Sequence, residues 1–549
     1  MNVDEFYKLN DNERVDWLAK AFLDELVRME PEAATYLGIH TEDHRVSEQS
    51  TESYIERINV IKKLLGLIKD IDTSKLDHEK EIDYEALKFS LELELFTTDE
   101  LRSWEKSPTG AWIAGDALFI LFTRDFAPFE ERIKNIISRI KQFPRVFEQD
   151  KERIKHPVKL WIENGLQSVE AIPMLFNEIV NAAKGKVSKE TFDELVAAIR
   201  STESAIEEYA KWLKEVANTA NNDWAIGPEK FAKLLKLRLI DYSPEEILKL
   251  GEDYLKKFKA QLEEIAKEID PNATVEEVDE RLSADHPKTF DEVLQLYRDS
   301  VKRAREWVIK SDFATIPEGD KFEVIPTPDY LIHILPFAAA IQPARFEKEK
   351  VGTYLVTPPK ENPDLLKAHE KAGIPNTTVH EAYPGHYLQG LAATFAPLAR
   401  MFGNPVEYIE GWAHYCEQAT KEMGFDNTPE ARFAQTKDLI WRAVRVIVDV
   451  KLSTGQMSFD EAVEYLIKET KMQKPSAIAE VNRYTTSPGY QLSYLLGKHM
   501  FLELREEVKK KLGDKYTPKF FHDTIIYSGA IPMKLLRKVF DYKIKEMLQ

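Results

Sequence analysis

Cysteine is almost missing from this sequence, since Cys416 is the only one among 549 residues. A single cysteine cannot form an internal disulfide, and this scarcity suits a reducing cytoplasm. Basic residues are also in deficit, because 76 Lys and Arg face 94 Asp and Glu, which gives a net charge of −18. A nucleic acid requires a basic surface, so we expect no nucleic-acid partner.

Long apolar runs are missing as well. The most apolar stretch, "LPFAAAIQPA" at 335–344, is too short to span a bilayer and contains prolines. The start, "MNVDEFYKLNDNERVDW", lacks the basic and apolar segments of a signal peptide. We therefore expect a soluble cytoplasmic protein with no membrane partner. Charged residues make up 31% of the chain, which together with many Lys and Glu is typical of a thermophile.

Helical periodicity dominates what is present. Apolar residues recur every three or four positions between charged ones in five long segments. Ser243 and Pro244 mark one helix start, as an N-cap followed by a first-turn proline. The five segments are 52–71, 83–101, 128–149, 189–217 and 243–269.

Between about 320 and 360 the pattern changes to short strands. "KFEVIPTP" (321–328) and "GTYLVTPP" (352–359) are β-branched and aromatic runs bounded by proline or glycine. We expect a mostly α, two-lobed body with a small β-sheet just before a His-rich helical segment. The expected division is an amino-terminal helical lobe (1–318) and a second lobe (319–549) that contains this segment, unless the two form one continuous domain. Helices are expected again at 376–400, 405–424, 429–455, 458–470, 476–482 and 488–512.

The segment "HEAYPGH" contains two histidines, His380 and His386, at an unusual spacing. Residues six apart on a straight helix point about 120° apart, so the two rings would not chelate one ion. Pro384 and Gly385 favour a kink or bulge that brings His386 round to the same side. The alternative is a helix end with two incidental histidines.

A second motif, "VEYIEGWAHYCEQA", supplies a third candidate ligand. Catalytic zinc sites use three protein ligands and leave one position open, and Glu410 follows His386 at a suitable distance. His414 and Glu417 lie at i+4 and i+7 from Glu410, on the same helix face. Glu417 is the next candidate ligand and His414 a candidate catalytic or substrate contact, while Glu410 as a surface acid is the alternative.

The two motifs resemble those of a known family. "HEAYPGHYLQ" followed by "EGWAHYCEQ" is similar to a large family of bacterial and archaeal proteins catalogued as a domain of unknown function. That family is placed in the zincin metallopeptidase superfamily through its HEAxPGH motif. The resemblance implies a helical, two-lobed body with the site in a deep cleft. This chain departs from the family at Ser453, where many members have histidine, and at Tyr490, where many have glutamine.

Downstream segments contain candidate substrate-binding residues. Arg442 and Arg445 share one helix face, and buried guanidinium groups require acceptors. They are either internal ion pairs or, with Arg483, a clamp for an anionic group such as a peptide's terminal carboxylate. Tyr484 and Tyr490 are candidate donors to the oxyanion of a tetrahedral intermediate, or else packed aromatics.

Together these residues predict a zinc-dependent hydrolase that cleaves peptide bonds of short or unfolded peptides, either carboxypeptidase-like or as an oligopeptidase. His380, His386 and Glu410 would hold Zn²⁺ (or Co²⁺ or Mn²⁺), and Glu381 would act as the general base. A metal-dependent amidase on a small non-peptide substrate is one alternative, and a catalytically silent helical binding protein is another. Serine or cysteine catalysis lacks support, because no G-x-S-x-G motif occurs. Peptide is the expected partner, and a homodimer is one admissible assembly.

Overall fold

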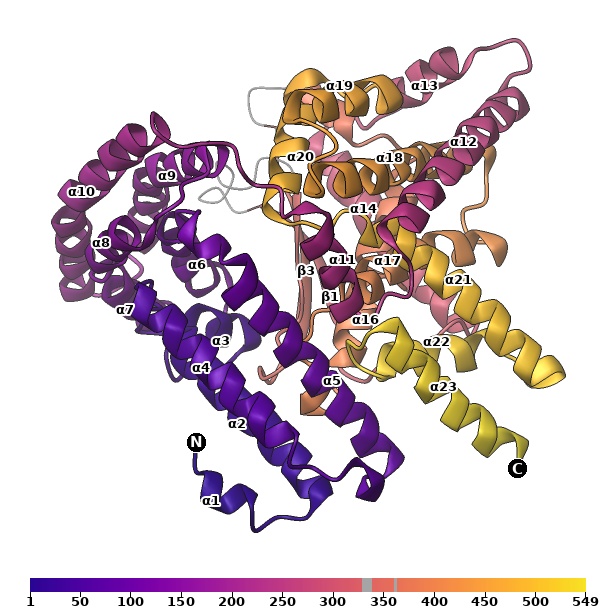
Figure 1. Cartoon of the computed structure of the whole chain (residues 1–549). Helices are drawn as coiled ribbons and strands as arrows, with labels where there is room; N and C mark the ends of the chain where they lie inside the picture. Colours follow the sequence, from indigo (N-terminus) through magenta and orange to yellow (C-terminus); the bar gives the residue numbers. More distant parts are fainter. Residues whose placement is uncertain (328–337, 360–362) are drawn as a thin grey trace.

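The computed structural model of the chain describes residues 1–327, 338–359 and 363–549. It is mostly helical with one small sheet, which confirms the fold class predicted from the sequence. The amino-terminal helices gather on one side of the molecule and the later helices on the other (Figure 1). None of the helices in the described residues is long and apolar enough to cross a membrane.

The amino-terminal part forms a layered helical body, in which the apolar faces of α6 to α10 share one buried cluster. The expected helix at 189–217 is confirmed in full, and that at 52–71 within three residues. The helices are α1 (Val3–Phe6), α2 (Asp11–Met29), α3 (Pro31–Leu37), α4 (Thr51–Ile68), α5 (His78–Leu95), α6 (Thr109–Thr123), α7 (Phe129–Ile140), α8 (Phe143–Arg153), α9 (Lys159–Ala183) and α10 (Lys189–Ala217).

The rest of the chain is built around two helix pairs. In one pair α12 packs along α18, and in the other α17 packs along α21. The N-cap predicted at Ser243 is present at the start of α12, where Glu246 completes a capping box. These helices are α11 (Gly227–Leu237), α12 (Pro244–Ile269), α13 (Val275–Ala284), α14 (Phe290–Lys310), α15 (Ile374–Glu381), α16 (His386–Ala393), α17 (Val406–Glu422), α18 (Pro429–Ser453), α19 (Phe459–Thr470), α20 (Lys474–Thr486), α21 (Ser493–Leu512), α22 (Pro518–Tyr527) and α23 (Met533–Leu548).

The largest buried cluster joins α11 to α14 with these later helices, although α11 to α14 precede residue 318. The division of the chain into units 1–318 and 319–549 therefore stays a prediction, because packing connects segments on both sides of that boundary.

The sheet has three short strands, β1 (Lys321–Pro326), β2 (Ala338–Ile341) and β3 (Val351–Val356), in the order β1-β3-β2. β1 pairs with β3 in parallel and β2 pairs with β3 antiparallel. The two expected strands are confirmed as β1 and β3, while residue 328 lies outside the described residues. β2 was not expected, because its sequence "AAAI" is poor in β-branched residues.

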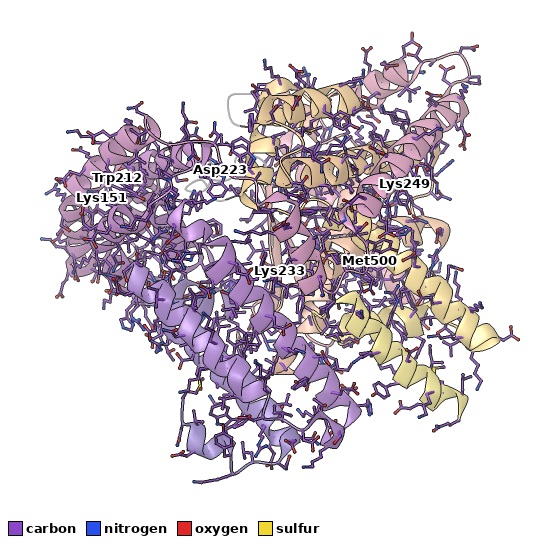
Figure 2. All side chains as sticks on the ribbon, viewed as in Figure 1. Lys151, Trp212, Asp223, Lys233, Lys249 and Met500 are labelled. Carbon is purple, nitrogen blue, oxygen red and sulfur yellow. The ribbon has the colours of Figure 1, made fainter. Side chains whose placement is uncertain are left out.

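The charged residues form ion pairs across the surface, as three side chains labelled in Figure 2 illustrate. Lys151 pairs with Glu148 at 2.6 Å and Lys249 with Asp253 at 2.8 Å, each within one helix. Lys233 on α11 reaches Glu100 at 2.5 Å and so connects the two sides of the molecule.

Candidate metal centre

The expected kinked helix at 376–400 is wrong, because the chain forms two separate helices there. α15 ends at Glu381 and α16 begins at His386. Between them Gly385 passes so close to the end of α15 that an added Cβ would lie 2.0 Å from the His380 carbonyl oxygen. Only glycine fits this approach, which brings His386 back beside His380.

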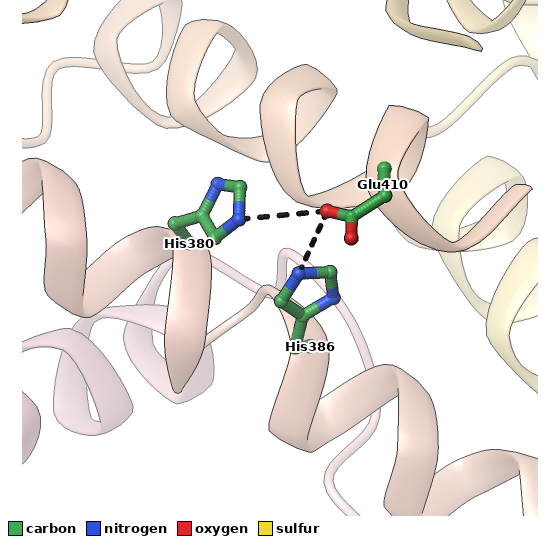
Figure 3. Close-up of side chains that lie close together, drawn as sticks. All are labelled: His380, His386 and Glu410. Atoms are coloured by element: carbon green, nitrogen blue, oxygen red, sulfur yellow. Dashed lines mark ion pairs between the residues drawn. The ribbon is translucent and has the colours of Figure 1, made fainter. Parts of the chain in front are cut away.

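The two histidines and Glu410 meet at one point (Figure 3). Glu410 Oε2 lies 3.2 Å from His386 Nε2 and 3.8 Å from His380 Nε2. A tetrahedral zinc ion with bonds of about 2.0–2.2 Å separates its ligand atoms by about 3.4 Å. The observed separations bracket this value, so the three residues fit one metal ion.

Two contacts hold α17 in the position that presents Glu410. Trp412 donates its indole N–H to the carbonyl of Pro384 at 3.0 Å, which ties α17 to the segment between the histidines. On the other side Gly411 of α17 meets Gly497 of α21, and an added Cβ on Gly411 would lie 2.5 Å from the Gly497 backbone. The glycine of the "EGW" motif therefore permits a close helix crossing.

The hydrogen bonds around the cluster direct two potential acceptor atoms toward its centre. His380 Nδ1 lies 2.8 Å from Glu417 Oε1, and since an ionised carboxylate only accepts, Nδ1 carries the ring proton. The lone pair of a neutral His380 therefore faces Glu410 Oε2. In the described part of the structure that buried oxygen receives no aligned hydrogen bond, whereas Glu410 Oε1 accepts one from Tyr490 at 2.8 Å. A bound metal ion would satisfy both atoms.

The histidines of the cluster lower the pKa values of the two carboxyl groups beside them, those of Glu410 and Glu417. Burial opposes ionisation of Glu410, but His386 and His380 outweigh it and hold the pKa of Glu410 well below its ordinary value. Burial likewise opposes ionisation of Glu417, yet its close contacts with His414 and His380 lower the pKa of Glu417 well below its ordinary value. Both side chains are therefore anionic.

A second group, His380, His414 and Glu417, is also close enough to be considered. However, the 2.8 Å between His380 Nδ1 and Glu417 Oε1 is a hydrogen-bond length and too short for two ligands of one zinc ion. Burial lowers the pKa of His414 to about 3, so its ring is neutral, and its Nε2 accepts from Arg442 at 3.3 Å. We therefore assign Glu417 the role of orienting the His380 ring. His414 belongs to the residues that surround the candidate ligands.

Glu381, the expected general base, ends α15 beside His380 and is partly exposed. Its charge faces Tyr297 of α14 and Tyr354 of β3. Burial and, more weakly, the Glu381 charge raise the pKa of both tyrosines, that of Tyr297 to about 12. No hydrogen bond to its carboxylate occurs among the described residues, so the carboxylate is available to a water molecule.

The two candidate tyrosines lie in different surroundings. Tyr490 touches the cluster through its bond to Glu410, and burial with the Glu410 charge raises its pKa. Tyr484 is buried in another network, where its hydroxyl donates to Glu480 at 2.7 Å and accepts from Arg445 at 3.0 Å. The structure thus brings Tyr490, but not Tyr484, to the candidate metal ligands.

The three candidate arginines are all paired within the chain. Arg445 and Arg483 both reach Glu480, at 3.0 and 2.9 Å. Arg442 pairs with Asp438 at 3.3 Å and touches His414, so it lies beside the cluster. The internal ion pairs considered from the sequence are therefore present, and a role in substrate binding stays a prediction.

Sequence reasoning missed two residues near the site, Asn376 and Tyr494. Asn376, one turn before His380, donates to Glu417 at 3.0 Å and accepts from Lys421 at 2.9 Å. The ring of Tyr494 lies 5.6 Å from that of His414 and 6.0 Å from that of Tyr490. Helical spacing could have identified both residues, because Asn376 is at i−4 from His380 and Tyr494 is at i+4 from Tyr490.

Comparison with known proteins identifies the family. The chain belongs to the family described as "Bacterial protein of unknown function (DUF885)", which matches residues 31–539. No curated protein matches the chain significantly.

Two solved structures share the whole fold. The crystal structure of "the putative lipoprotein from Colwellia psychrerythraea" has a TM-score of 0.86 and 21% sequence identity, and the match covers 98% of this chain and 100% of that chain. The structure of "a putative lipoprotein of unknown function from Shewanella oneidensis" has a TM-score of 0.79 and 20% identity, over 97% of this chain and 99% of that one. At such identities the likeness establishes the fold alone.

Proposed function

We propose that this protein is a metal-dependent hydrolase of the zincin type that cleaves peptide bonds in short or unfolded peptides. The observation that carries the proposal is the meeting of His380, His386 and Glu410, with a buried Glu410 oxygen that lacks a hydrogen-bond donor among the described residues. Two imidazoles and one carboxylate are a ligand set typical of hydrolytic zinc, with Co²⁺ or Mn²⁺ as substitutes.

Each residue of the site has a separate role in the proposed reaction. When bound, the metal ion supplies a Lewis acid that polarises a carbonyl oxygen and lowers the pKa of water. Glu381 takes the proton of the attacking water and passes it to the leaving amine. Glu417 fixes the ring of His380, and Tyr490 fixes the carboxylate of Glu410. Oxyanion stabilisation by Tyr484 or Tyr490 stays a prediction.

The choice between carboxypeptidase and oligopeptidase depends on how the peptide's end is held. A carboxypeptidase needs a cation for the terminal carboxylate, and Arg442 is the candidate arginine beside the cluster. Comparing one peptide as free acid and as C-terminal amide separates the two cases. A carboxypeptidase loses most of its kcat/KM on the amide, whereas an oligopeptidase does not.

The direct test is a digest of a mixed peptide library by the zinc-loaded protein, read by mass spectrometry. We expect cleavage that chelation abolishes and zinc restores. The matched variant is Glu381→Gln, which should keep the metal and lose at least about 10²–10⁴ in rate. Undiminished cleavage by metal-loaded Glu381→Gln would place the base elsewhere. Cleavage of small amides but no peptide would favour an amidase, and no hydrolysis at all a silent binding protein.

We also propose a cytoplasmic location, supported by the single, buried Cys416. The similar solved structures are named putative lipoproteins, so membrane anchoring through lipid is the competing case. Fractionation of cells that express the natural gene distinguishes them, because an anchored protein sediments with membranes.

A further inference from the structure

A cavity of about 300 Å³ lies between α12, α17, α18 and α21. These four helices belong to the later part of the chain, where α12 packs on α18 and α17 on α21 (Figure 1). Each of the four helices contributes to its lining. The metal ligands do not line it, because α17 presents Glu410 and Glu417 to the cluster and Gln418 and Glu422 to the cavity.

Lys498 of α21 lines this cavity with a charge that nothing neutralises directly. The residue is only 3% exposed. In the described part of the structure its ammonium forms neither a hydrogen bond nor an ion pair, and its contact is the ring of Phe258 at 6.0 Å. Burial lowers the pKa of Lys498 to about 8, so the group is still mostly protonated at neutral pH. A buried ammonium is costly unless an anion pairs with it.

Two further donors in the same cavity lack acceptors. Gln435 Nε2 and Arg432 Nε are both buried and make no hydrogen bond among the described residues. Arg432 uses only its other end, since Nη2 binds Glu268 at 2.6 Å. Buried donors normally find a partner, so three unsatisfied donors in one cavity indicate a missing acceptor.

The charge of the lining agrees with this reading. Lys257, Lys421, Lys498 and Arg432 face the cavity with a single acid, Glu422. Glu422 already forms an ion pair with Arg505 at 2.7 Å. The lining thus has four basic side chains against one acid, although Arg432 also pairs with Glu268 and the Lys421 ammonium donates to Asn376.

We propose that this cavity binds a small oxyanion through Lys498, Gln435 and Arg432. A phosphate, a sulfate or the carboxylate of a small molecule offers only acceptors and a negative charge, which matches three donors and no free acid. The volume lies at the lower end for ligand pockets and leaves room for a short carbon body beside Phe258 and Leu439. The site is distinct from the metal cluster and does not depend on hydrolytic activity.

The test is calorimetric titration of the full chain with phosphate, sulfate and acetate in separate arms, each against chloride at the same ionic strength. We expect one site per chain for at least one oxyanion. A response to phosphate and sulfate assigns a tetrahedral ligand, and a response to acetate a carboxylate. Lys498→Met should weaken binding at least tenfold, while Lys510→Met, an exposed lysine of the same helix, should not change it.

A second variant keeps the test decisive if Lys498→Met does not fold. Gln435→Glu places a carboxylate in the cavity with almost no change of shape, so it should occupy the site from within and abolish oxyanion binding. The proposal is overturned if none of the three oxyanions binds beyond the chloride control. It is also overturned if affinity is unchanged in Gln435→Glu or in folded Lys498→Met.

Discussion

At the scale of single residues, Glu417 decides how His380 is presented. Its carboxylate fixes the proton of His380 on Nδ1 and leaves Nε2 directed at Glu410. Asn376 and Lys421 continue this chain of hydrogen bonds behind Glu417. Such partners orient a ligand and raise its basicity, so they control metal affinity without touching the metal.

We therefore expect Glu417→Gln to weaken zinc binding by about 10–100-fold while the protein stays folded. A competition titration with a chromophoric chelator measures the affinity. Glu422→Gln, which removes a carboxylate from the same helix but away from the cluster, is the matched control and should bind zinc as the parent does. Equal affinities for all three proteins would contradict the orienting role.

Asp449 has a comparable role toward Tyr490. Its carboxylate accepts from the backbone N–H groups of Gly489 and Leu492, at 2.8 and 3.0 Å, and so holds the turn that carries Tyr490. Residue type and spacing suffice to predict the three candidate ligands, which the structure brings together. It does not predict partners such as Asn376, Asp449 and Tyr494, because their roles depend on which helix faces meet.

At the scale of elements, the proline-glycine pair was expected to kink a helix and instead separates two. Residue properties predict a disruption at Pro384 and Gly385, but its extent depends on tertiary contacts such as the bond from Trp412 to the Pro384 carbonyl. The same holds for the crossing of α17 and α21. Its two glycines, Gly411 and Gly497, lie 86 residues apart in the sequence, so the sequence alone does not indicate that they meet.

The crossing leads to a prediction for Gly497→Ala. The added Cβ would lie 2.2 Å from the Glu407 carbonyl oxygen, so α17 and α21 must separate. We expect a loss of about 1–3 kcal/mol in the free energy of unfolding, measured by urea denaturation, because a packed interface does not yield freely. Gly66→Ala in α4 is the control, since its Cβ would meet nothing within 4 Å and should stabilise by about 0.5–1 kcal/mol. If Gly497→Ala leaves the free energy of unfolding unchanged, the close crossing of α17 and α21 is refuted.

At the scale of the whole molecule, the segment between β2 and β3 is tied to the amino-terminal helices. Glu347 of that segment lies 3.2 Å from Arg124 and 3.6 Å from His40, and the backbone N–H of Phe346 donates to Leu37. Gly38 adopts a φ of +86° there, and a Cβ added to it would lie 2.8 Å from Glu347. The predominance of helix was predictable from periodicity, but such connections between distant segments were not.

His40 makes this connection sensitive to pH. Burial favours its neutral ring, but Asp43 and Glu347 outweigh burial and raise the pKa of His40 to about 9. Because folding raises this pKa, the stabilisation is complete below about pH 6.5 and is lost as the pH rises through about 9. Allowing for partial exposure, the parent should lose about 1 kcal/mol more than His40→Gln between pH 6.5 and 9.5, by urea denaturation. Parallel pH profiles for the two proteins would contradict this account.

The metal cluster itself is tested most directly by the zinc content of purified protein after exhaustive dialysis, for the parent, His386→Ala and His414→Gln. If His380, His386 and Glu410 are the ligands, the parent and His414→Gln each retain about one equivalent of zinc and His386→Ala retains none. Retention by His386→Ala together with loss by His414→Gln would show that the metal lies with Glu417 instead, and that the central assignment is wrong.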